Sequence, residues 1–296
     1  MAAAVAVLSA SGQDARFRSG VDLVRVDALV TDGNRIVTGL KAADFELRDN
    51  GVLQTVEAIA LESMPLTLTF VLDTSGSVAG GKMTHLTSAV DVILRGLRPQ
   101  DRVGLVTFSH QVWQRVPLTS DIQLLRGVLT GTTGAGGTSL NDAVYAGLAL
   151  SESQDARALV LVFSDGMDNS SWLGRTTVER AARRADAVVY GVAVAAGARG
   201  VIDMGSGRSV RFRPEYLPGQ TDFLEAVASA TGGRVIKADE TVNLPQAFEE
   251  ILQEFRTRYV ITYSPASDAL GWHSIDLKVK GRRADVKARR GYERSR

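Results

Sequence analysis

Residues 66–77 read LTLTFVLDTSGS, an apolar run followed directly by carboxylate and hydroxyl side chains. A near-continuous apolar run is typical of a strand that is buried on both faces of a parallel sheet. The polar residues begin at Asp73 and include Gly76, which allows a tight turn. The stretch therefore predicts a central strand that places oxygen-bearing side chains at one end of a sheet.

Similar apolar runs recur along the middle of the chain, with helix-patterned segments between them. The further apolar runs are 103–108, 158–163, 187–194 and 234–238, and the helix-patterned segments are 82–97, 121–129, 139–153, 176–186, 221–230 and 243–256. This alternation predicts an α/β domain over residues 63–256, with a doubly wound, mostly parallel sheet of the Rossmann-like type. VWQRVPL (112–118) follows the second strand too closely for a crossover helix, so we expect an antiparallel edge strand there.

The two ends of the chain have a different, β-like texture. Residues 20–62 alternate apolar and polar side chains between turns such as Asp32-Gly33-Asn34, and 257–293 contain further strand-like segments. Among these, 272–280 and 284–290 flank a turn that reads KGRR. Each terminal region has about 40 residues, too few to bury a core alone. We therefore expect one discontinuous β-sandwich domain made by both termini, with the α/β domain inserted into it.

Composition excludes several classes of protein. The 296 residues are 45% hydrophobic and 23% charged with a net charge of +1, which gives no general attraction to nucleic acid. No apolar stretch is long enough for a membrane span, and the absence of cysteine excludes thiolate metal sites. Residues 1–18 are interpreted as the remnant of a signal peptide or as a disordered terminus. We expect export to the periplasm, the cell surface or the medium, with a cytoplasmic location left open.

Hard oxygen ligands cluster at one predicted edge of the sheet. Ligands of open α/β sheets bind at the carboxyl ends of the strands. Three loops bring such side chains there: Asp73, Ser75 and Ser77 come from the first, Thr138 from the second, and Asp165 from the third. Mg²⁺ prefers one or two carboxylates completed by other oxygens and water. The pattern therefore predicts a divalent cation site, with Mg²⁺ favoured and Mn²⁺ or Ca²⁺ as alternatives.

The segments Asp73-Thr74-Ser75-Gly76-Ser77, Gly136-Gly137-Thr138 and Ser164-Asp165-Gly166 resemble the von Willebrand factor type A (vWA) domain and its metal-ion-dependent adhesion site. The resemblance implies that the ion is held by Asp73, Ser75, Ser77, Thr138 and Asp165. It further implies a non-enzymatic module whose ion accepts an aspartate or glutamate carboxylate from a partner protein. It also suggests that ligand binding shifts the helix near 243–256. The flanking regions resemble those of vWA-related proteins of acidobacteria.

A different motif overlaps this site. Gly76 to Lys82 spell G-x-x-x-x-G-K, most of a nucleotide-binding P-loop, but Met83 stands where that motif needs Ser or Thr for Mg²⁺. No nucleotide is therefore expected. An aspartic protease is also disfavoured, because a second Asp-Thr-Gly-like segment is missing.

Four neighbouring residues have two readings each. Asn141, Asp142 and Asp168 are local caps or supports of the metal ligands, and Trp172 packs in the core or contacts a ligand. The histidines at 85, 110 and 273 are far apart in sequence and are expected to act separately, with none beside the ion. Two other functions stay open: a structural subunit with a vestigial site, and a metal-assisted hydrolase, which would need a general base. The partner, the native ion and the oligomeric state are not specified by the sequence.

Overall fold

The computed structural model describes residues 23–60, 64–76, 81–129, 136–151, 156–194, 200–203, 209–212, 219–238 and 243–294. None of its described helices is both long enough and apolar enough to cross a membrane.

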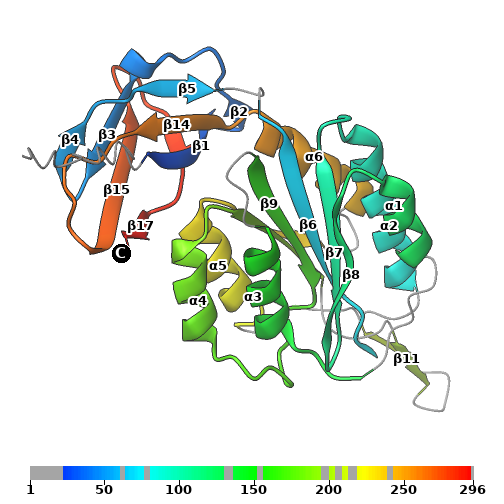
Figure 1. The fold of residues 1–296 in the computed structure, drawn as a ribbon. Coiled ribbons are helices and arrows are strands. Elements are labelled where there is room, and N and C mark those ends of the chain that lie inside the picture. Colours follow the sequence, from blue (N-terminus) through cyan, green and yellow to red (C-terminus); the bar gives the residue numbers. More distant parts are fainter. Residues whose placement is uncertain are drawn as a thin grey trace, which may run out of the picture.

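A six-stranded sheet forms the centre of the α/β part (Figure 1). Its strands, in spatial order, are β13 (Val235–Ala238), β10 (Val188–Val194), β9 (Arg157–Ser164), β6 (Leu66–Asp73), β7 (Arg102–Phe108) and β8 (Val112–Thr119). All neighbours pair in parallel except β7 and β8, which are antiparallel. Each residue of β6 and of β9 is buried, as expected for strands covered on both faces. The predicted parallel strands and the antiparallel edge strand are confirmed.

Helices cover both faces of this sheet. One face packs against α1 (Gly81–Gly96), α2 (Ile122–Leu129) and α6 (Leu244–Arg256), and the other against α3 (Leu140–Leu150), α4 (Arg175–Arg184) and α5 (Asp222–Thr231). Alternate residues of β6 supply the two cores: Leu68, Phe70 and Leu72 face the first group of helices, and Val71 faces the second. The result is the doubly wound α/β arrangement that the apolar periodicity predicts.

Two further sheets combine strands from both ends of the described chain. The first contains β16 (Asp285–Lys287), β1 (Val24–Asp32), β14 (Tyr259–Tyr263), β5 (Ala58–Ala60) and the short β2 (Arg35–Ile36). The second contains β17 (Gly291–Arg294), β15 (Gly271–Val279), β3 (Phe45–Asp49, after the 3₁₀ turn η1 at Ala42–Asp44) and β4 (Val52–Gln54). One apolar cluster, which includes Val26, Leu47, Ile261 and Leu277, draws on both sheets.

Two details differ from what the sequence suggests. The strands on either side of the KGRR turn do not form a hairpin: β15 pairs with β3 and β17, whereas β16 pairs with β1. Local patterns report strands but not their partners, so this exchange between sheets is invisible in the sequence. The antiparallel pair β11 (Gly200–Asp203) and β12 (Ser209–Phe212) is also unexpected, because its segments are too short to show a clear period.

Buried arginines join the terminal sheets to the edge of the central sheet where its parallel strands begin, here called the amino edge. Arg157, the first residue of β9, donates from Nη2 to Asp27 Oδ1 of β1 at 2.6 Å and to Phe255 O at 2.8 Å. Arg258, between α6 and β14, is fully buried. It donates to Tyr190 Oη at 3.1 Å and to the carbonyl oxygens of Asp27, Gly232 and Lys287 at 3.0, 2.7 and 3.1 Å. The two parts of the molecule are thus bonded through side chains and backbone.

Candidate metal centre

Asp73 lies at the opposite edge of the central sheet, where the parallel strands end, here called the carboxyl edge. It is the last residue of β6, between β7 and β9, and its side chain is buried. Its Oδ1 accepts the backbone N–H of Ser75 at 2.8 Å, and its Oδ2 accepts the hydroxyl of Ser164 at 2.7 Å. Strand pairing on both sides therefore fixes this carboxylate, and two serines orient it.

Asp165 follows β9 directly and is also buried, with 1% of its surface exposed. Its Oδ1 accepts the backbone N–H of Met167 at 3.0 Å, and its backbone carbonyl accepts the side-chain amide of Gln220. The second carboxylate oxygen, Oδ2, is buried and has no hydrogen-bond partner in the described part of the chain. Buried polar atoms are nearly always satisfied, so an unsatisfied carboxylate oxygen indicates a missing partner.

The electrostatics of Asp73 point the same way. Burial raises the pKa of the Asp73 carboxyl, hydrogen bonds from Ser75 and Ser164 lower it, and the charge of Asp165 raises it again. The two carboxylates are therefore close enough to repel each other when both are ionised. Neither forms an ion pair with a described residue. A cation at this position would remove the penalty for both.

Thr138 is brought to the same edge by a clamp between two loops. Its backbone N–H donates to Asn169 Oδ1 at 2.8 Å, and its carbonyl accepts the N–H groups of Asn169 and Ser170 at 3.0 and 3.1 Å. At Gly137 a Cβ would collide with these two side chains, which explains the glycine. Thr138 itself is 3% exposed. The clamp joins the loop before α3 to the loop after β9.

The D-x-S-x-S turn is held by its neighbours. The Thr74 hydroxyl donates to Phe108 O of β7 at 2.9 Å, and the Gly76 N–H donates to Gly136 O at 3.3 Å. Ser75 is buried, with 1% exposed. Ser77, the third predicted ligand of this turn, lies outside the described residues.

Asn141, Asp142 and Asp168 tie the loop after β9 to the start of α3. Asp168 Oδ2 accepts the Asn141 N–H at 2.8 Å and the Ser171 hydroxyl at 2.6 Å. Asp142 accepts the N–H groups of Trp172 and Leu173 at 2.9 and 2.8 Å. Asp168 thus accepts an N–H of the first turn of α3, as a cap does, whereas Asp142 binds the loop backbone before α4. Trp172 does not pack in the core, since 96% of its surface is exposed.

The expectation that no histidine lies beside the site is wrong. His110 follows β7 at the carboxyl edge; its carbonyl accepts the Ser139 hydroxyl at 3.1 Å, and its ring lies against Gly136. The sequence does not show this, because His110 and Gly136 are 26 positions apart and only folding places the His110 ring against that loop. Its Nδ1 is 3.4 Å from Ser109 Oγ, beyond the about 2.6–3.2 Å over which a base activates a hydroxyl. His273 is buried elsewhere, bonded to Asp49 at 2.8 Å.

The residues present fit a hard divalent cation. Asp73 and Asp165 supply carboxylates, Ser75 and Thr138 supply hydroxyls, and these are ligands that Mg²⁺ accepts. Among the described residues, no group of three or more His, Asp or Glu side chains is gathered around one point. A cation here would therefore depend on hydroxyls and water to complete its shell.

The model of the von Willebrand factor type A domain family matches residues 68–167, which include most of β6, the turn after it, α3 and β9. Over these residues the chain matches the vWA family, as the motifs predict. It is 24% identical over 275 residues to human inter-alpha-trypsin inhibitor heavy chain H4, covering 85% of this chain and 28% of that protein. The chain thus spans under a third of the length of that relative.

Solved structures agree on the fold. A von Willebrand factor type A protein from Catenulispora acidiphila superposes with a TM-score of 0.52 at 12% identity, covering 91% of this chain and 73% of that one. Proximal thread matrix protein 1 from the mussel byssus gives a TM-score of 0.52 at 13% identity, covering 70% and 49%. The resemblance of the flanks to acidobacterial proteins stays a prediction.

Three residues that support the site were not among the predicted ligands. Ser164 bonds Asp73, Asn169 clamps Thr138, and Gln220 holds the Asp165 carbonyl. Ser164 belongs to the Ser164-Asp165-Gly166 motif and Asn169 follows Asp168, so their position along the chain indicated a role. Gln220 is 55 positions from its partner, and only the fold brings it there.

Proposed function

We propose that this protein is a non-enzymatic binding module in which a divalent cation, Mg²⁺ in the first place, accepts a carboxylate from a partner protein. Asp73, Ser75, Ser77, Thr138 and Asp165 would hold the cation. When bound, the ion supplies an open coordination position that an aspartate or glutamate carboxylate of the partner can occupy. The vWA domain itself supports a protein-interaction or adhesion module at the coarser level.

One observation supports the metal above all others: two buried carboxylates repel each other, and one of their oxygens, Asp165 Oδ2, has no hydrogen-bond partner among the described residues. Burying an unpaired carboxylate is costly, and repulsion between two of them adds to the cost. For a purely structural role, neutral amides at these positions would have a smaller free-energy cost of burial than carboxylates. The charges are explained if a cation occupies the space between them.

The ligand set of the site favours binding over hydrolysis. Two carboxylates balance the charge of a divalent cation, the hydroxyls add no charge, and the ion still needs further oxygen ligands to complete its shell. A hydrolase would need a positioned base, and the His110 ring lies against the Gly136 backbone with only a long contact to Ser109. The partner's carboxylate is thus the simplest ligand for the remaining position.

The proposal extends to the domain organisation. Residues 20–62 and 257–293 would form a single β-sandwich domain, and residues 63–256 the inserted vWA domain. Support comes from the shared apolar cluster of the two terminal sheets, to which β1, β3, β14 and β15 all contribute. An exported location belongs to the same proposal, and fractionation of the native cells would test it.

The test is calorimetric titration of Mg²⁺ and Mn²⁺ into the metal-free protein, with thermal melting alongside. We expect wild type to bind and to melt higher with metal, since a ligand at 100 times its Kd adds about 2.7 kcal/mol of stability. Asp73→Asn keeps the shape and the bond from Ser75 but should lose about 100-fold or more in affinity, beyond the loss for an outer contact. Asp276→Asn, an exposed carboxylate on β15, is the matched control and should bind as wild type does. Absence of metal binding by wild type would refute the proposal.

A further inference from the structure

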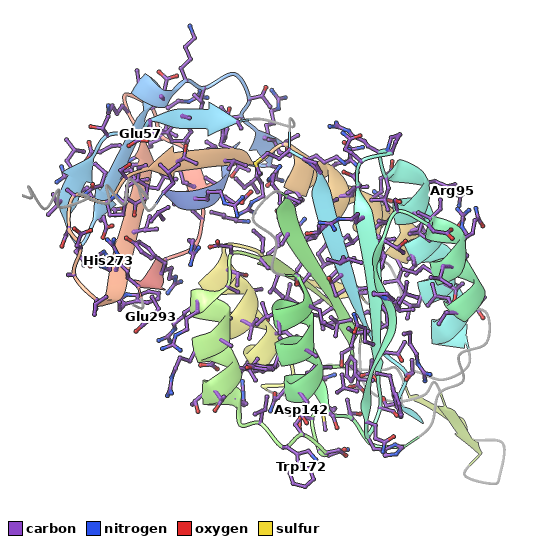
Figure 2. All side chains as sticks on the ribbon, viewed as in Figure 1. Glu57, Arg95, Asp142, Trp172, His273 and Glu293 are labelled. Carbon is purple, nitrogen blue, oxygen red and sulfur yellow. The ribbon has the colours of Figure 1, made fainter. Side chains whose placement is uncertain are left out.

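Trp172 is the most exposed large apolar side chain of the described residues, with 96% of its surface open to solvent. It lies in the loop between β9 and α4, at the end of the α/β part away from the terminal sheets (Figure 2). Tryptophan is ordinarily largely buried, and it is enriched at protein interfaces, where one large side chain supplies much of the contact. An indole that is fully exposed therefore needs a reason.

The loop that presents Trp172 is fixed by hydrogen bonds to α3. The N–H groups of Trp172 and Leu173 donate to the two oxygens of Asp142, and the Asn141 side chain donates to Leu173 O at 3.1 Å. One residue earlier, the Ser171 hydroxyl donates to Asp168 and accepts the Asp142 N–H at 3.2 Å. The backbone on which the indole stands is thus positioned in advance, so binding would cost little ordering of the chain.

The same loop also forms part of the candidate metal centre. It begins at Asp165 and holds Thr138 through Asn169 and Ser170. Met167, two residues after Asp165, is a second exposed apolar side chain, at 38%. The carboxylate ligand, the threonine clamp and the exposed indole therefore share one rigid segment of eight residues, 165–172.

Charges of both signs lie near Trp172. Asp142 and Asp168 have their oxygens engaged by backbone N–H groups. Arg175, at the start of α4, is exposed and lies 5.7 Å above the ring of Phe223. On this surface, the carboxylate of a partner segment would meet the proposed metal ion, and its large apolar side chain would meet the Trp172 indole.

We propose that Trp172 is the apolar anchor of the partner-binding surface: the partner segment places a large apolar side chain against the indole while its neighbouring acidic residue reaches the cation. This proposal rests on the function proposed above. It adds that recognition requires an apolar residue close in sequence to the acidic one, and it assigns that requirement to Trp172.

The test uses a displayed library of random peptides with one fixed aspartate, selected in Mg²⁺ against four proteins: wild type, Trp172→Ser, Asp73→Asn and Leu270→Ser. Leu270 is an exposed apolar residue, 55% exposed, that precedes β15 in the other part of the molecule. We expect wild type and Leu270→Ser to enrich peptides with a large apolar residue within about three positions of the aspartate. The selected peptide should then bind Trp172→Ser about 10- to 30-fold more weakly, as for removal of an interface hot spot.

The two proposals fail in different ways. If Trp172→Ser enriches the same apolar peptides with unchanged affinity while Asp73→Asn enriches none, the anchor is wrong and the metal function stands. If wild type and Asp73→Asn behave alike, or wild type enriches nothing in Mg²⁺, the metal function fails and the anchor with it. Because Trp172 is exposed, Trp172→Ser should melt at the wild-type temperature, which separates binding from folding.

Fluorescence distinguishes the other occupants of an exposed indole. In a Trp113→Phe, Trp272→Phe background, emission from Trp172 should shift to the blue when the selected peptide binds, and EDTA should reverse the shift. A blue shift on mixed phosphatidylcholine and phosphatidylglycerol vesicles without peptide would overturn the proposal in favour of a membrane surface. A shift that depends on protein concentration, with dimers in sedimentation, would overturn it in favour of a second copy of the chain.

Discussion

At the carboxyl edge of the central sheet, Asp73 and Asp165 bury two negative charges, whereas at the amino edge Arg157 and Arg258 bury two positive ones. The arginines find most of their partners within the chain: Arg157 bonds Asp27 at 2.6 Å, and Arg258 bonds three carbonyl oxygens and the Tyr190 hydroxyl, although its Nε has no partner in the described residues. The aspartates have hydroxyl and amide partners, but Asp165 Oδ2 has none in the described residues.

The difference separates a structural use of buried charge from a binding use. Buried charges are tolerated when they are paired or hydrogen-bonded: Arg157 is paired with Asp27, and the terminal nitrogens of Arg258 make four hydrogen bonds. Charges left incompletely paired reduce the stability of the free protein and increase its affinity for whatever completes them. Figure 1 shows the terminal sheets beside the amino edge, with the carboxyl edge at the far end of the molecule. The contacts that join the terminal sheets to the central sheet therefore lie apart from the candidate binding surface.

The largest effect should come from breaking the amino edge at Arg258. Arg258→Met removes donors to three backbone carbonyls and to Tyr190 while roughly preserving side-chain length. We expect the free energy of unfolding to fall by about 3–5 kcal/mol, measured by urea denaturation followed by circular dichroism. Arg282→Met, on the exposed turn after β15, is the control and should change it little. A decrease of less than about 1 kcal/mol in the free energy of unfolding would show that the contact between the two parts does not depend on Arg258.

A smaller effect is expected from closing the space at Gly232. This residue ends α5 with φ of +82°, and a Cβ there would lie 2.7 Å from the backbone of Ala288 and Arg289. Gly232→Ala should cost about 1–3 kcal/mol in thermal unfolding, from backbone strain and the contact together. Gly281 has φ of +70° with open space around it, so Gly281→Ala measures the strain alone. Equal losses in the two variants would mean that the contact between the two parts can relax freely.

At the carboxyl edge, removing a buried charge should increase the free energy of unfolding instead of decreasing it. The raised pKa of Asp73 means that the folded, metal-free protein holds this proton more tightly than the unfolded chain. The contribution of Asp73 to stability therefore falls as pH rises above the ordinary pKa of 3.8 and through the folded pKa. In EDTA at about pH 7, Asp73→Asn should therefore be more stable than wild type, and the gap should close in acid. Denaturant unfolding of both proteins across this range checks it. A less stable variant at neutral pH would contradict the comparison.

The smallest change should follow Asp168→Asn, which distinguishes a cap from a support of the ion. The Asp168 carboxylate is committed to Asn141 and Ser171, so loss of one acceptor should cost about 1 kcal/mol of stability. Affinity for Mg²⁺, by calorimetry, should fall less than tenfold. A loss of about 10- to 100-fold would instead assign Asp168 to the outer shell of the metal.

The α/β core and the chemical character of the site are both predictable from local sequence. Apolar runs such as 66–72 and 158–163 identify buried strands because burial on both faces excludes polar alternation. Asp73 and Asp165 are recognisable because each follows such a run, and parallel strands must end at one edge. Both inferences need only short-range patterns.

Contacts between distant segments could not be predicted from the local sequence. The bond between Arg157 and Asp27 joins residues 130 positions apart, and Arg258 reaches Asp27 O across 231. Arg157 begins an apolar strand and Arg258 directly precedes one, but that position does not show which distant groups either arginine will bond. The same applies to His110, whose place beside the site depends on the loop containing Gly136 folding back onto it.

By itself, therefore, the sequence determined the alternation of strands and helices and the oxygen-rich residues at the strand ends, because periodicity and strand-to-turn order are local properties. Only the tertiary structure decided which charges are paired, which strand joins which sheet, and that Trp172 stands in solvent on a rigid loop. Those outcomes depend on burial and on long-range contacts, and the chain acquires both only when its distant segments pack together.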